Sequence, residues 1–144
     1  MILPSPTHAL LLGGALSAAA ALAHLACIAI GAPAYRWMGA GESMARAVEA
    51  GRWQPHAMTL GIAAVLAVWS AYAFAAAGRL PALPLMKPAL VAISTVYLLR
   101  GLAFPLLMPR FPGNSLGFWL VSSGICLLIG LLYGWGTADR WSAL

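Results

Sequence analysis

The chain has 144 residues, of which 62% are hydrophobic and only 8% are charged, and its mean hydropathy is +0.89. Soluble domains usually carry about 25% charged residues, so this composition excludes an ordinary water-soluble domain. The net charge of +5 could indicate nucleic-acid binding. All but one of the basic side chains, however, fall at or between the ends of long apolar segments, where they suit lipid headgroups, and we expect no nucleic-acid partner.

The apolar residues form four blocks long enough to cross a bilayer. A hydrocarbon core of about 30 Å needs roughly 20 helical residues, and backbone groups in lipid have to be hydrogen-bonded within the protein. The sequence therefore predicts an all-α fold: one integral membrane domain over residues 1–144, built as a four-transmembrane-helix bundle. The predicted spans are about 7–31, 56–78, 87–108 and 114–136.

The first predicted span, 7–31, is too long for the apolar region of a signal peptide and no basic residue precedes it, so we expect it to stay uncleaved. Small and polar residues recur along it at gaps of three and four, which indicates a face that packs against protein. These residues are Gly13, Ser17, Ala20, His24, Cys27 and Gly31. His24 is either a hydrogen-bonded packing residue or a proton carrier.

The loop after the first span predicts a short interfacial helix at about 42–50, ended by Gly51. Helical spacing places Glu42, Arg46 and Glu49 on one face of it. Tyr35, Trp37 and Trp53 flank this helix as aromatic anchors at a headgroup boundary would. Four crossings place this loop and the turn at 109–113 on one side, here called the B side, and both chain ends on the other, the A side. We expect the loop helix to cover the bundle on the B side.

The second and fourth predicted spans also carry small and polar residues at helical spacing, which favours close helix packing. In the second span these are His56, Thr59, Ala63, Ser70 and Ala77, and in the fourth they are Ser123, Cys126, Gly130 and Gly134. His24 and His56 differ in depth, which argues against haem, and the sequence indicates no metal site, no cofactor and no disulfide between Cys27 and Cys126. No motif of a catalytic site is found.

The third predicted span contains Arg100, the most informative residue of the chain. An arginine within a membrane span is costly, by about 2.5–3.5 kcal/mol near the centre, so it usually faces the protein interior and has a partner. It either reaches toward B-side headgroups or pairs with Glu42 or Glu49, or its guanidinium holds an anionic group in a cavity open to the B side. The residues we expect around such a ligand are Tyr97, His24, Thr59, Ser122, Ser123, Glu42 and Glu49. Pro105 removes a helix hydrogen bond near this cavity.

Three functions fit these features. The first is binding or transport of a small anionic or amphipathic ligand, such as a lipid, at Arg100, and it is the one we favour. The second is an accessory or structural membrane subunit, in which the small-residue faces contact another protein or a second copy in a homo-oligomer. The third is an interfacial membrane enzyme, which predicts Glu42 or Glu49 beside a histidine.

The chain resembles a group of small four-span bacterial integral membrane proteins with no established activity. The resemblance rests on Gly39–Glu42, Trp53–Pro55, Tyr72 and Tyr97–Leu102. It implies location in the bacterial inner membrane and implies no mechanism. Unlike small multidrug transporters, the chain has no acidic residue in its first span, which argues against their proton-coupled mechanism. We expect both termini in the cytoplasm, although nearly equal Lys and Arg counts on the two sides leave the orientation open.

Overall fold

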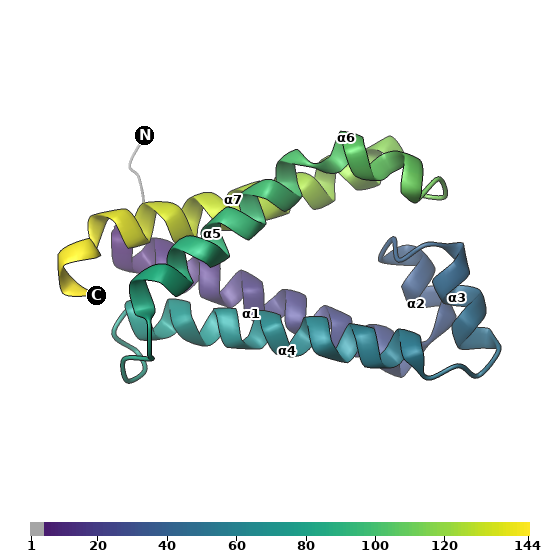
Figure 1. Cartoon of the computed structure of the whole chain (residues 1–144), viewed down its shortest axis with the longest axis horizontal. Coiled ribbons are helices and arrows are strands. Elements are labelled where there is room, and N and C mark those ends of the chain that lie inside the picture. The colour runs from purple at the N-terminus through teal and green to yellow at the C-terminus, as the bar shows by residue number, and fades with distance from the viewer. Residues whose placement is uncertain (1–4) are drawn as a thin grey trace.

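The computed structural model describes residues 5–144, and over these residues the chain is helical with no strand (Figure 1). Three helices, α1, α4 and α7, are each long and apolar enough to cross a membrane. The helices are α1 (Pro6–Ile30), α2 (Ala32–Trp37), α3 (Glu42–Glu49), α4 (Gln54–Ala76), α5 (Met86–Leu102), α6 (Phe104–Leu107) and α7 (Leu116–Asp139). Two short 3-10 turns, η1 (Met108–Arg110) and η2 (Trp141–Ala143), follow α6 and α7.

The third predicted span is not one helix, which corrects the expectation for 87–108. Helix α5 ends at Leu102, and the segment formed by α6 and η1 turns away from its axis by 61°. Pro105 explains the break, because it has no N–H to donate to the carbonyl of Gly101. α5 alone has 17 residues, so this part of the chain is long enough for a membrane span only together with the segment beyond the bend.

The long helices form two pairs, because α1 packs along α4 and α5 packs along α7. Figure 1 shows the pairs meeting near the chain ends and separating toward the side that carries α2 and α3. Small residues permit the close approach within each pair, as predicted. Ser70 donates to the carbonyl of Gly14 over 2.8 Å, and Ser94 donates to the carbonyl of Gly130 over 2.8 Å.

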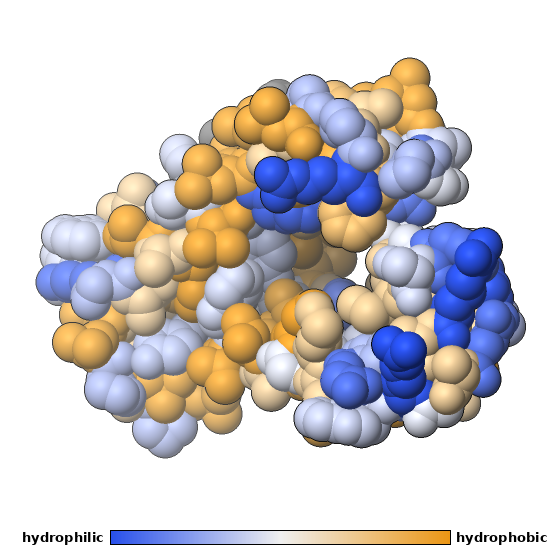
Figure 2. All heavy atoms as spheres, turned by 45° about the vertical axis from the view of Figure 1, so that its right-hand side comes forward, coloured by the Kyte–Doolittle hydropathy of each residue, from blue (hydrophilic) through white to orange (hydrophobic). Residues whose placement is uncertain are grey.

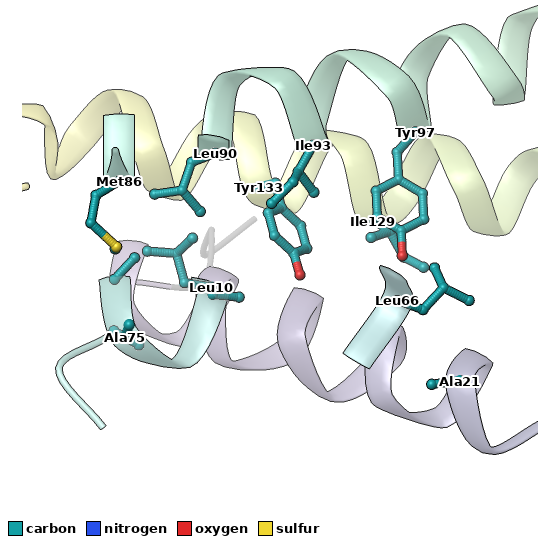
Figure 3. Close-up of a cluster of buried hydrophobic side chains, with 13 residues drawn as sticks. Leu10, Ala21, Leu66, Ala75, Met86, Leu90, Ile93, Tyr97, Ile129 and Tyr133 are labelled. Carbon is teal, nitrogen blue, oxygen red and sulfur yellow. The ribbon is translucent and has the colours of Figure 1, made fainter. Parts of the chain in front are cut away.

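A buried layer of hydroxyl groups holds the two pairs together. The Ser17 hydroxyl lies 2.9 Å from that of Tyr97 and 3.1 Å from that of Tyr133, and Tyr133 donates to the carbonyl of Trp69 over 2.9 Å. The hydroxyl of Tyr133 has one proton and donates it to the Trp69 carbonyl, so it accepts from Ser17. Ser17 has then donated its own proton, so it accepts from Tyr97. Figure 3 shows both tyrosine hydroxyls directed from α5 and α7 toward the other pair. The hydrogen bonds therefore run in one fixed direction through all four long helices.

Candidate functional site

Arg100 extends from α5 across the face of α7. Its Nη2 donates to the Ser122 hydroxyl over 3.2 Å, and its guanidinium carbon lies 5.4 Å from the centre of the Trp119 ring. Gly101 allows this approach, because a Cβ there would come within 2.6 Å of Leu127 and 3.0 Å of the Ser123 carbonyl. Ser122 and Trp119 belong to the first two turns of α7, so the guanidinium leans toward the B side.

The charge of Arg100 has no acidic partner among residues 5–144. The chain has three acidic residues, and the ion pairs of Glu42 and Glu49 go to Arg36 and Arg46. Asp139 ends α7, 17 residues beyond Ser122, which is about 25 Å along the helix. The alternative in which Arg100 pairs with Glu42 or Glu49 is therefore not found, because both carboxylates are paired with other arginines.

Three buried polar atoms beside this position lack a hydrogen-bond partner in the described part of the chain. They are Nη1 of Arg100, Nε1 of Trp119 and the hydroxyl oxygen of Ser123. Trp119 and Ser123 are each only 3% exposed. An unsatisfied buried donor costs about 1–3 kcal/mol, and more when it is charged, so this group of atoms has capacity to bind a further polar or anionic group.

The carboxylates of α3 bind arginines of the lid, by which we mean residues 32–51. Arg36 contacts Glu42 at 2.9 Å and Glu49 at 2.7 Å, and Arg46 contacts Glu42 at 3.1 Å. Hydrogen bonds from Arg36 and then Arg46 lower the pKa of Glu42 to about 2, and the hydrogen bond from Arg36 lowers the pKa of Glu49. Neither carboxylate is hydrogen-bonded to a histidine in the described structure, so the geometry that the enzyme hypothesis predicts is not found.

The lid touches the start of α7 and the segment that leads into it, and we call this contact the roof. Asn114 donates to the carbonyl of Gly39 over 3.0 Å, and a Cβ on Gly39 would overlap the ring of Phe118. Gly39 has a φ of +76°, which suits glycine. On the other side the lid is fixed to α4, because the Tyr35 hydroxyl lies 3.0 Å from Nδ1 of His56. Tyr35 is only 2% exposed, so the expectation that it is an interfacial anchor is wrong.

A crevice lies between the floor, formed by Ser17, Tyr97 and Tyr133, and the roof. Figure 2 shows the face hollowed between the two pairs, with hydrophilic atoms on its rims. From Tyr133 to Phe118 the α7 wall is 15 residues, or about 22 Å, long. Two pockets of about 220 and 410 Å³ lie elsewhere, one lined by α5, α7 and Trp141 and the other by α1 and α4. Arg100 lines neither of them, and it lies against α7 on the B side of the floor.

The predicted ligand-binding residues occupy different places. Tyr97 is 6% exposed and forms part of the floor. Thr59 donates to the carbonyl of Pro55 in its own helix over 2.8 Å, so its proton is already used. His24 is half-buried on α1, and Nδ1 of its ring contacts the carbonyl of Ala20 at 2.7 Å. Ser122 and Ser123 lie beside Arg100 or its helix, whereas Glu42 and Glu49 do not.

Trp119 was missed by the sequence interpretation, although its ring faces the guanidinium of Arg100. The sequence feature that could have indicated it is helical spacing, since Trp119 lies three residues before Ser122 and four before Ser123. Its ring also packs on Phe111 and Phe118, with centroid distances of 6.2 and 5.8 Å. Within residues 5–144 no three His, Cys, Asp or Glu side chains are grouped as metal ligands would be.

Comparisons with protein-family models, with curated proteins and with solved structures find no match to this chain.

Proposed function

We propose that the chain is a four-span membrane protein that binds an anionic amphipathic molecule in the crevice, with the guanidinium of Arg100 as the anion site. The observation that carries this proposal is the uncompensated charge of Arg100. Its Nη1 is buried without a partner among residues 5–144, and the acidic side chains of the chain are bound to Arg36 and Arg46 or lie far along α7. An anion from outside the chain would supply the missing counter-charge and hydrogen bond.

The shape of the crevice favours an amphipathic ligand over a small soluble anion. The guanidinium lies near the B end of α7, where a headgroup would be placed, and the floor of tyrosine side chains lies deeper. Val96, one helical turn before Arg100 and on the same side of α5, is about half exposed, so this region offers apolar surface to an acyl chain. A molecule with an anionic head and an apolar tail matches both parts.

This proposal includes a topology. In it α5 crosses the membrane together with the bent segment after Ala103, so that both chain ends lie on one side, in the cytoplasm of a bacterial cell, and the protein belongs to the inner membrane. The exposed rings of Trp37 and Trp53 on the B side and of Trp135 and Trp141 on the A side support it, because such rings favour the two interfaces. Association into a homo-oligomer stays a prediction.

The proposal is tested by native mass spectrometry of the protein in mild detergent, with anionic and zwitterionic phospholipids of the same acyl chains. We expect Arg100→Leu to weaken binding of the anionic lipid by about tenfold or more, because hydrogen bonds to charged groups contribute about 1.5–3 kcal/mol. Arg110→Leu is the matched control, since it removes the same charge from an exposed B-side position. Equal losses in the two variants, or none in either, would refute an anion site at Arg100.

A further inference from the structure

His24 presents a hydrogen-bond acceptor that nothing in residues 5–144 uses. Its Nδ1 lies 2.7 Å from the carbonyl oxygen of Ala20, and a carbonyl can only accept. Nδ1 therefore carries the proton, and in the neutral ring Nε2 carries a lone pair. No side chain or backbone group in the described structure is hydrogen-bonded to Nε2, although an unpaired polar atom in an apolar environment is costly.

The register of the helices places His24 of α1 and Arg100 of α5 on the B side of the floor. His24 follows Ser17 by seven residues, which puts it about 20° around α1 and about 10 Å farther toward the B side. Ser17 faces Tyr97, and Arg100 follows Tyr97 by three residues, about 4.5 Å toward the B side. The side chain of Arg100 then leans farther in that direction, to Ser122. Arg100 is also rotated about 60° around α5 from Tyr97, toward α7. The donor and the acceptor thus lie on different helix pairs in the same half of the membrane.

We propose, on the basis of the proposed function, that the ligand carries a neutral hydroxyl group near its anionic group. The anion binds the guanidinium of Arg100, and the hydroxyl donates to Nε2 of His24. The chemistry that fits is a phosphate ester of a polyol, either as the glycerol headgroup of an anionic phospholipid or as a free polyol phosphate. An ammonium headgroup fits less well, because it would lie beside the Arg100 cation while Glu42 and Glu49 are already paired with Arg36.

Two lipids that differ only in this hydroxyl chemistry test the proposal without any mutation. Phosphatidylglycerol and phosphatidylpropanol with the same acyl chains carry the same single negative charge and a three-carbon headgroup, and only the first has headgroup hydroxyls. Each is titrated into delipidated wild-type protein, and Kd is measured by native mass spectrometry. We expect phosphatidylglycerol to bind about fivefold more tightly, the effect of one neutral hydrogen bond. Glycerol 1-phosphate is titrated in parallel as the soluble source.

Three variants test which residue causes the preference for phosphatidylglycerol. We expect His24→Leu to abolish the difference between the two lipids, His8→Leu to preserve it, and Arg100→Leu to weaken the binding of both. Binding of glycerol 1-phosphate that depends on both His24 and Arg100 would support the same chemistry with a soluble ligand. Equal binding of the two lipids to wild type overturns the hydroxyl proposal and leaves the anion site standing if both still depend on Arg100. Binding of neither lipid in an Arg100-dependent way overturns both proposals.

Discussion

The close approach of α5 and α7 is tested by a pair of glycines in α7. A Cβ added at Gly130 would lie 2.8 Å from the Leu98 side chain and 3.1 Å from its backbone nitrogen, and the Gly130 carbonyl accepts the Ser94 hydroxyl. A Cβ added at Gly124 would meet nothing within 4 Å. Gly130→Ala therefore perturbs the contact that brings Arg100 against α7, whereas Gly124→Ala leaves it alone.

The expected magnitude follows from two terms. Replacing Gly by Ala within a helix gains up to about 1 kcal/mol, and this gain is similar at the two positions. Overpacking a close contact costs about 1–3 kcal/mol, and only Gly130→Ala incurs it, because the backbone of Leu98 cannot rotate away as a flexible side chain would. We expect Gly130→Ala to be less stable than Gly124→Ala by about 1–3 kcal/mol.

The measurement is reversible unfolding of both variants and wild type by titration with a denaturing detergent in mixed micelles, followed by circular dichroism. Retention of the helical signal before the transition shows that each variant folds. If Gly130→Ala unfolds at the same or a higher denaturant fraction than Gly124→Ala, the helices do not approach as described, and the placement of Arg100 against Trp119 loses its support.

Two further predictions concern the floor and the lid. Tyr133→Phe removes two hydrogen bonds and Tyr97→Phe removes one, so at about 0.6 kcal/mol for each bond in a membrane we expect Tyr133→Phe to be the more destabilising. Detergent-titrated unfolding checks the order, and the reverse order would contradict the two contacts described for Tyr133. Glu42 should titrate near pH 2 in the folded protein by carbon-13 NMR of its carboxyl group. Because its pKa is lowered on folding, its ion pairs stabilise the lid fully above the ordinary carboxyl pKa of about 4.5 and lose this effect as the pH falls toward about 2. Arg36→Gln should return the midpoint toward the ordinary value while Arg52→Gln should not, and a midpoint near 4.5 in wild type would show that the pairs do not form in solution.

Four of the helices could be predicted from the sequence, because each depends on the composition or spacing of its own residues. Apolar runs long enough for a span predicted α1, α4 and α7, and the spacing of Glu42, Arg46 and Glu49 predicted α3. The break after Leu102 was not predicted, although Pro105 was noticed. A proline can be tolerated in a membrane helix when neighbouring groups satisfy the freed carbonyl, and that depends on tertiary contacts which no local pattern shows.

The partners of the charged groups were the part that the sequence left undetermined. Glu42 and Glu49 had several arginines within reach, and the choice of Arg36 depends on α2, a six-residue helix too short to be predicted from periodicity. The contact of Arg100 with Trp119 depends in turn on how α5 and α7 are aligned. Single polar residues in a span indicated that a site exists, and helix packing decided which residues share it.

The separation of the two helix pairs toward the B side has a consequence for how a ligand would arrive. In a four-span arrangement the leaflet on the A side surrounds helix pairs that are in contact (Figure 1). In the leaflet on the B side the two pairs are separate, so a lipid can lie between them. A lipid would then reach Arg100 by sliding sideways within its own leaflet, a search in two dimensions. Its acyl chains would never pass through water, which avoids a cost of about 0.8 kcal/mol for each CH₂ group transferred.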